Sequence, residues 1–153
     1  MTKHFIDFDN LSFEVLQDII DCAIALKKQH NESAINNSLK NKTLAMIFDK
    51  SSTRTRVSFE AGMAQLGGHA LFLSNNDIQL GRGEPITDSA IVISSMVDAV
   101  ILRISSHEDI IEFSKHSNKP VINALSDLSH PCQILADLMT FQELKGSING
   151  KKV

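Results

Sequence analysis

Apolar residues near the N-terminus recur at helical spacing. Five of them come every three or four positions, which is the period of one helix face: Leu16, Ile19, Ile20, Ala23 and Leu26. Ser12 precedes this face and is a suitable N-cap, with Glu14 in the first turn. The pattern therefore predicts a helix that begins after Ser12. Residues 31–42 are polar and are predicted to be a connection.

Four later apolar runs are continuous rather than alternating, which is typical of strands buried on both faces. They cover residues 44–48, 70–73, 99–102 and 120–122. Helix-compatible stretches lie between them at 55–66, 88–97 and 107–116, and a last one covers 133–144. The last stretch places Ile134, Leu138 and Phe141 on one face. This alternation predicts an α/β fold of three layers: a four-stranded parallel sheet core with helices on both faces.

Composition narrows the function classes. The chain has 153 residues, of which 42% are hydrophobic, which suits one globular core without a membrane span. The net charge of -3 disfavours a broad nucleic-acid surface. Two cysteines without CxxC spacing indicate a reducing compartment, and we expect a cytoplasmic protein. The six histidines have no metal-ligand spacing, so neither a metal nor a cofactor is expected.

The last residues resemble the start of another element. Residues 146–150 have the composition of a loop, and residues 151–153 look like the first step of a further strand. We therefore interpret residues 1–150 as one domain and residues 151–153 as the start of a second domain that is cut off.

Polar groups follow all four predicted strands, where open parallel sheets bind their ligands. Residues 49–56 bring hydroxyls and guanidinium groups to a helix start, which suits a phosphate. Residues 75–85 form a polar loop after the second strand, Arg103 follows the third, and residues 128–133 follow the fourth. Several of these groups are cationic in an acidic protein, which indicates a small anionic ligand.

Each of these groups also has an ordinary structural explanation. Residues 52–55 could only cap a helix, Arg103 could form a surface ion pair, and His130 could be a turn residue. Gln133 could be a first-turn helix residue, and Cys132 a small apolar filler. Their convergence at one sheet edge favours a binding site. Neither GxxxxGK[ST] nor GxGxxG is present, which disfavours P-loop and dinucleotide sites.

Two motifs carry a family resemblance. Residues 48–55, FDKSSTRT, match F-x-[EK]-x-S-[GT]-R-T, and residues 130–133, HPCQ, match HPxQ. The chain thereby resembles, over essentially its whole length, the carbamoyl-phosphate-binding half of the aspartate/ornithine carbamoyltransferases. The loop at 77–84 and residues 125–128 and 134–137 resemble the ornithine enzymes. Aspartate, putrescine and acetylornithine enzymes stay open, because acceptor choice in the family lies mainly in the other half.

The resemblance implies a role for each motif residue. Arg103, His130 and Thr55 would be catalytic and contact the carbamoyl oxygen, while Gln133 and the backbone near Pro131 would contact the carbamoyl amide. The phosphate would be held by Ser52, Thr53, Arg54 and Thr55, with Gln79 donated by an adjacent subunit.

The resemblance also implies a reaction and an assembly. The parent enzyme would be a homotrimer of arginine biosynthesis that transfers the carbamoyl group of carbamoyl phosphate to the δ-amine of L-ornithine. The products would be L-citrulline and phosphate. Ornithine would bind through the missing second domain, so this chain alone would be inactive. The alternatives from other classes are a non-catalytic anion-binding module and a receiver-like α/β domain that works through a protein partner.

Overall fold

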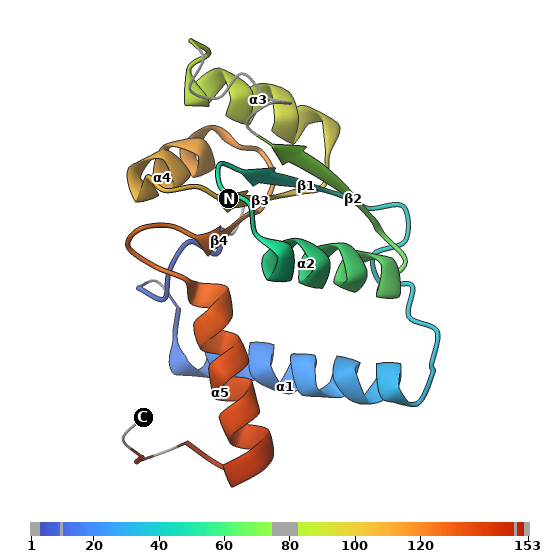
Figure 1. Ribbon diagram of the computed structural model, residues 1–153. Coiled ribbons are helices and arrows are strands. Elements are labelled where there is room, and N and C mark those ends of the chain that lie inside the picture. Colours follow the sequence, from blue (N-terminus) through green and yellow to red (C-terminus); the bar gives the residue numbers. More distant parts are fainter. Residues whose placement is uncertain (1–3, 10, 75–82, 149, 152–153) are drawn as a thin grey trace.

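A computed structural model describes residues 4–9, 11–74, 83–148 and 150–151 (Figure 1). The helices within these ranges are α1 (Phe13–Asn31), α2 (Thr53–Gln65), α3 (Ile86–Met96), α4 (His107–His116) and α5 (Pro131–Lys145). The strands are β1 (Thr43–Phe48), β2 (His69–Ser74), β3 (Ala99–Arg103) and β4 (Val121–Leu125). Every predicted strand and helix is present, with ends that differ by up to about five residues, which is most evident in α1.

The four strands form one parallel sheet in the order β2-β1-β3-β4. The register sets Phe48 beside Arg103, and Arg103 beside Leu125. The carboxyl ends of β1, β3 and β4 therefore lie level with one another. This confirms the predicted parallel sheet and brings the loops that follow three strands to one edge.

Helices cover both faces of the sheet, which confirms the three-layer α/β fold. Leu44, Met46 and Phe48 of β1 pack in a cluster with Met63 of α2. The alternate residues of β1 pack on the other face, in a cluster with residues of α3 and α4. Figure 1 shows α2 on one side of the sheet and α3 and α4 on the other. From β1 the chain crosses through α2 to β2 on one side, and from β2 it crosses back through α3 to β3 on the other side of β1. Because both crossovers between parallel strands are right-handed, α2 and α3 must lie on opposite faces of the sheet.

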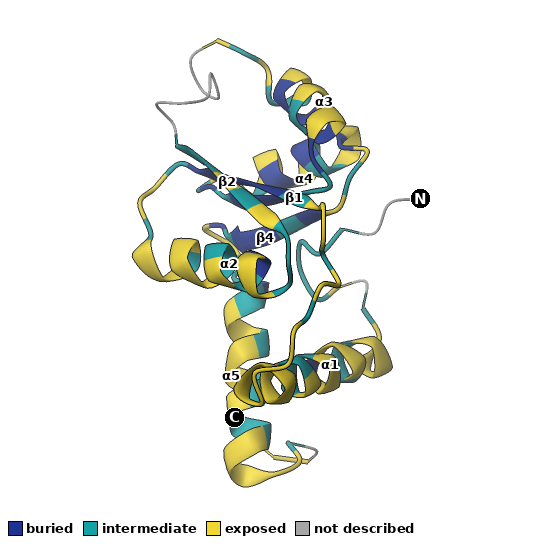
Figure 2. Cartoon of the chain, turned by 90° about the vertical axis from the view of Figure 1, so that its right-hand side faces the viewer, coloured by how far each residue is buried: buried dark blue, intermediate teal, exposed yellow. Residues whose placement is uncertain are grey.

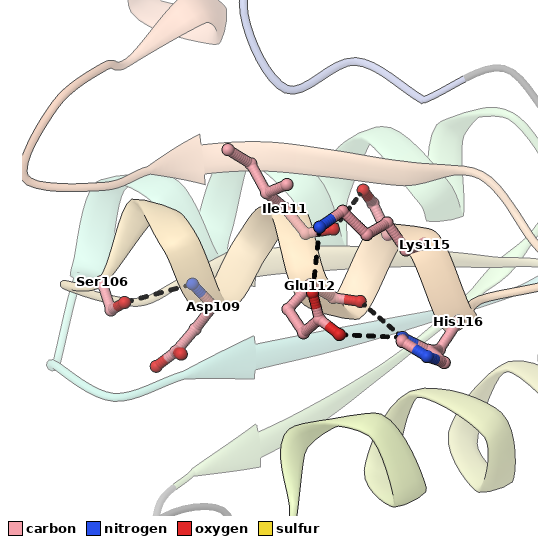
Figure 3. Close-up of polar contacts among 7 residues, drawn as sticks. Ser106, Asp109, Ile111, Glu112, Lys115 and His116 are labelled. Carbon is pink, nitrogen blue, oxygen red and sulfur yellow. Dashed lines mark hydrogen bonds and ion pairs between the residues drawn. The ribbon is translucent and has the colours of Figure 1, made fainter.

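Side-chain caps begin two of the helices. Ser12 accepts from the Val15 amide (3.4 Å), and Ser106 accepts from the Asp109 amide (3.1 Å) at the start of α4 (Figure 3). Farther along α4, Glu112 pairs with two residues of the last turn, Lys115 and His116. An exposed pair such as Lys115–Glu112 contributes a few tenths of a kcal/mol, about 0.2–0.5. The prediction of a helix at 107–116 is confirmed residue for residue.

The predicted apolar face of α5 is wrong in part. Ile134 is 44% exposed, and Pro131 is the buried residue of this helix. Figure 2 shows that α5 extends away from the sheet with mostly exposed residues. Its first turns pack on β4 and its later turns meet α1, where Gln17 Nε2 donates to Gln142 Oε1 (3.2 Å). Apolar spacing thus found the helix but not the surface that it covers.

A short N-terminal segment lies along the outer edge of β4. The Phe5 amide donates to the Val121 carbonyl (2.8 Å), and the Asn123 amide donates to the Phe5 carbonyl (2.8 Å). The described part of β4 is therefore hydrogen-bonded on both sides. No helix within the described ranges is long and apolar enough to cross a membrane.

Candidate active site

A pocket of about 470 Å³ opens at the carboxyl ends of β1, β3 and β4, which is the size range of small-ligand sites. Two of its described lining residues are cationic and none is acidic, so the local charge favours an anion. The lining consists of Ser52, Arg54, Thr55, Ser58, Phe59, Arg103, Leu125, His130, Cys132, Gln133 and Ala136.

Two helices begin at this pocket without a side-chain cap. Ser52 is the N-cap of α2 and His130 is the N-cap of α5, yet neither side chain makes a capping hydrogen bond. Ser12 and Ser106 do cap their own helices, away from the pocket. Because the first amides of a helix have no partner within it, these two helix starts offer N–H donors and positive dipole ends to a ligand.

Arg103 links the end of β3 to the first turn of α2. Its Nη1 donates to Thr55 Oγ1 over 3.1 Å, while its Nε is buried and meets no hydrogen-bond partner in the described part of the chain. The pairing of β3 with β4 shifts register between Leu102 and Arg103, and such irregularities often re-aim a side chain beside an active site. A buried donor without a partner costs about 1–3 kcal/mol, which an anionic ligand would offset.

The surroundings of His130 favour its neutral imidazole. Burial, and then the positive charge of Arg103, lower the pKa of His130 below its ordinary 6.5, and Asp137 only partly opposes them. Its Nδ1 is buried and has no partner among the described residues. A neutral imidazole can donate one hydrogen bond to a carbonyl oxygen without adding a second positive charge beside Arg103.

Asp49 ties the ends of β1 and β3 together. Its backbone amide donates to the Arg103 carbonyl (3.0 Å), and its carboxylate accepts from the amide (2.7 Å) and the hydroxyl (2.9 Å) of Ser105. The segments on both sides of Arg103 are thereby fixed to the segment that leads into α2. Sequence reasoning assigned Asp49 no role, although an acidic residue directly after a buried strand was a signal.

Residues 3–143 match the family described as "Aspartate/ornithine carbamoyltransferase, carbamoyl-P binding domain". The chain belongs to this family. It is 68% identical over its whole length to the ornithine carbamoyltransferase of Ruthia magnifica subsp. Calyptogena magnifica, of which it covers 51%. The chain therefore spans about half the length of the curated relatives that it matches.

Solved structures of ornithine carbamoyltransferases share the fold of this chain. The ornithine carbamoyltransferase of Pyrococcus furiosus superposes with a TM-score of 0.94 at 48% identity, covering 97% of this chain and 47% of that one. The enzyme of Burkholderia thailandensis gives a TM-score of 0.93 at 49% identity, with coverage of 97% and 51%.

The two carbamoyltransferase motifs do not place all their residues in one cavity. Gln133 lines the main pocket, and its Nε2 donates to Asp137 Oδ1 (2.9 Å). Thr53 lines a neighbouring pocket of about 500 Å³ on the other side of the α2 start, and Pro131 is buried. Gln79 lies outside the described residues. Ser58, Phe59 and Ala136 line the main pocket but were missed, because helical residues without charge give no local signal.

Metal chemistry has no ready ligand set in the described ranges. Nowhere in them do three or more histidine, cysteine, aspartate or glutamate side chains gather closely enough to hold an ion. Cys132 lines the pocket, and burial raises the pKa of its thiol to about 11. The pocket is thus surrounded by hydrogen-bond donors, an arrangement that is suited to holding an anion and polarising a carbonyl group.

Proposed function

We propose that this chain holds carbamoyl phosphate in an enzyme that carbamoylates the δ-amine of L-ornithine, giving L-citrulline and phosphate in arginine biosynthesis. The observation that carries the proposal is the meeting of Arg103, Thr55 and His130 in one pocket between two uncapped helix starts. The names of relatives at 50% identity and above support ornithine as the acceptor.

The phosphate lies at the start of α2. Arg54 supplies a bidentate charged partner, and Ser52, Thr53 and Thr55 supply hydroxyls and helix amides. A hydrogen bond to a charged group contributes about 1.5–3 kcal/mol, so this cluster accounts for most of the affinity for the ligand. When the carbon–oxygen bond to the leaving phosphate breaks, the same groups stabilise its added negative charge.

The carbamoyl group lies between the ends of β3 and β4. Arg103, His130 and Thr55 donate to its carbonyl oxygen, while Gln133 and the backbone near Pro131 contact its amide. The uncharged ornithine amine attacks the carbonyl carbon, and negative charge grows on the oxygen as the tetrahedral intermediate forms. The intermediate then collapses as the bond to phosphate breaks, and the departing phosphate takes up the proton that the amine loses. A fixed donor aimed at such an oxygen lowers the barrier by about 2.7–4 kcal/mol. The steps need neither a metal nor a covalent enzyme intermediate.

The complete enzyme needs more than this chain. Relatives are about twice as long, and in our proposal residues 1–150 form the carbamoyl-phosphate domain and the ornithine-binding domain starts at about Lys151. The active enzyme is a homotrimer in which Gln79 reaches the pocket of a neighbouring subunit. Both cysteines are free, which supports a reducing compartment, and we assign the enzyme to the cytoplasm.

Calorimetric titration with carbamoyl phosphate tests the proposal, with acetyl phosphate as the analogue that lacks the carbamoyl amide. We expect tighter binding of carbamoyl phosphate and a loss of about ten-fold or more in Arg54→Ala, because each lost charged hydrogen bond weakens binding by about that factor. The matched control is Lys115→Ala, which removes an exposed cation of α4. Equal binding of the two phosphates would favour a simple anion-binding module.

Turnover separates the acceptors. The longer protein that contains this chain is assayed for carbamoylation of ornithine, aspartate, putrescine and acetylornithine, and ornithine is expected to be used fastest. The 153-residue chain alone is expected to form no citrulline, because orientation of two substrates can be worth about 7–11 kcal/mol. Citrulline formation by the chain within about ten-fold of the longer protein would contradict this division.

A further inference from the structure

One polar side chain is completely buried at the end of the sheet nearest His130. Asn123 has 0% exposure and interrupts the otherwise apolar sequence of β4. Its amide nitrogen Nδ2 donates to the Ile6 carbonyl (3.0 Å) and to the Ser129 carbonyl (3.3 Å). The side chain therefore joins the N-terminal segment to the loop that leads into α5.

The contacts of Asn123 bracket His130 on both sides. The Ser129 carbonyl belongs to the peptide bond that enters His130, so the hydrogen bond from Asn123 fixes the plane of that peptide. Two residues after His130, Cys132 Sγ donates to the backbone carbonyl of Asn123 (3.4 Å). The segment that carries the imidazole is therefore hydrogen-bonded to Asn123 on both sides of His130.

The loop itself is closed by a small set of hydrogen bonds. The Ser126 amide donates to the Ser129 carbonyl (2.9 Å), and the Ser129 amide donates to Ser126 Oγ (3.1 Å). Ser126 Oγ also lies 2.8 Å from His107 Nδ1 of α4. These bonds shape the turn, while Asn123 connects the turn to the sheet and, through the Ile6 carbonyl, to the N-terminal segment.

We propose that Asn123 is a positioning residue, which holds the Ser129–His130 peptide so that the imidazole faces the carbamoyl pocket. An asparagine amide has two N–H donors in one plane, which serve the two carbonyl groups. An aspartate would be acceptor-only when ionised, and an apolar residue would leave both carbonyls without this donor. Asn123 Oδ1 is buried without a partner in the described part of the chain, so it is the donors that the site uses.

The effect of Asn123 on catalysis rests on the proposed carbamoyl transfer, whereas its effect on His130 does not. The first experiment therefore follows the His130 ring by NMR, with its signal assigned by its loss in His130→Gln. In Asn123→Ala, the His130 ring signal is expected to shift or broaden and its titration midpoint to move. Ser94→Ala is the matched control, because Ser94 is also buried and hydrogen-bonded but belongs to α3, where its hydroxyl donates to the Ile91 carbonyl.

A second variant covers the case in which Asn123→Ala does not fold. Ser126→Ala removes the hydroxyl that accepts from the Ser129 amide and contacts His107 Nδ1, but it keeps the donors of Asn123. It is expected to change the His130 signal in the same direction by a smaller amount. Folding of each variant is checked by far-ultraviolet circular dichroism. A folded Asn123→Ala with an unchanged His130 signal overturns the proposal, and so does an unchanged signal in Ser126→Ala when Asn123→Ala is unfolded.

Kinetics of the longer protein that contains this chain supply the last measurement. Asn123→Ala is expected to lower kcat at least about ten-fold with a smaller change in KM, because misplacement by about 1 Å can cost up to ~10²-fold. Ser94→Ala is expected to stay within about two-fold. If the His130 signal changes in Asn123→Ala but the wild type transfers no carbamoyl group, the proposed function is refuted and the positioning role stands. An unchanged signal with normal transfer refutes the positioning role alone.

Discussion

The Arg103 guanidinium donates to Thr55 Oγ1 over 3.1 Å, although the two residues lie 48 positions apart in the chain. Arg103 ends β3 and Thr55 stands in the first turn of α2, which follows the adjacent strand β1. The chain turns to opposite sides after these two strands, and ligand crevices of parallel sheets form at such switch points. The contact therefore holds the guanidinium at the place where the topology opens the sheet edge.

Thr55→Val is expected to weaken phosphate binding. The valine has the same shape but cannot accept from Arg103, and loss of one hydrogen bond corresponds to about 0.5–1.5 kcal/mol, or roughly 2–10-fold in Kd. Calorimetric titration with inorganic phosphate measures the change. Thr140→Val is the control, because its hydroxyl donates to the Ala136 carbonyl within α5. Equal affinities of the two variants for phosphate would mean that the hydrogen bond between Arg103 and Thr55 does not contribute to anion binding.

Asp49→Asn is expected to lower stability and anion affinity together. The two bonds from Ser105 to the carboxylate would become neutral, with a loss of about 1–3 kcal/mol in the free energy of unfolding, measured by urea denaturation. Ser105→Ala should lose less, since the backbone amide bond stays. Asp18→Asn on exposed α1 is the control and should stay within about 0.5 kcal/mol. If Asp49→Asn changes stability as little as the control does, the contacts between Asp49 and Ser105 do not stabilise the fold.

His130 is expected to make stability fall at acid pH. Because the pKa of His130 is lowered in the folded state, the unfolded chain takes up a proton first as the pH decreases. The free energy of unfolding should then decrease as the pH falls through about 6.5, and level off below the folded pKa. Burial lowers the pKa of His4 as well, so the wild type contains both contributions.

Comparison of variants separates the two histidines. His130→Gln should lose less stability than the wild type between about pH 8 and pH 5.5, and His4→Gln should also lose less. Urea midpoints at each pH provide the measurement. A pH dependence in His130→Gln that equals that of the wild type would mean that His130 titrates alike in both states.

The two cysteines are expected to differ in reactivity. Cys22 is exposed, whereas Cys132 is largely buried and its pKa is raised to about 11. Because the thiolate is the reactive form, iodoacetamide at about pH 8 should modify Cys22 at least about ten-fold faster. Peptide mass spectrometry over time measures both rates, and the rates should converge in urea. Equal rates in the folded protein would place Cys132 in contact with solvent.

Mixed subunits test the shared site of the proposed trimer. In the longer protein, Gln79→Ala and Arg54→Ala should each impair activity, because each alters every site. Trimers reassembled from a mixture of the two should regain part of the activity, since some sites then combine an intact Arg54 with an intact Gln79. Hybrids that are no more active than the parent variants would indicate that each subunit builds its site alone.

The sequence by itself determined the element types and the chemistry at the strand ends. Continuous apolar runs identify strands that are buried on both faces, and the STRT and HPCQ segments keep their donors within a few consecutive positions. Periodicity and short motifs are local properties, so they can be read from neighbouring residues. The same locality explains the errors: the spacing of Ile134, Leu138 and Phe141 indicated a helix but not which surface it would cover.

Only the tertiary structure decided which side chains meet. The register that sets Phe48, Arg103 and Leu125 side by side depends on how whole strands pack. The tie from Asp49 to Ser105 spans 56 residues, and the bond from Asn123 to Ile6 spans 117. These contacts form because burial of the sheet between two helix layers brings distant segments together and leaves their polar groups to pair with one another. No local pattern encodes that proximity, since it arises from the packing of the whole domain.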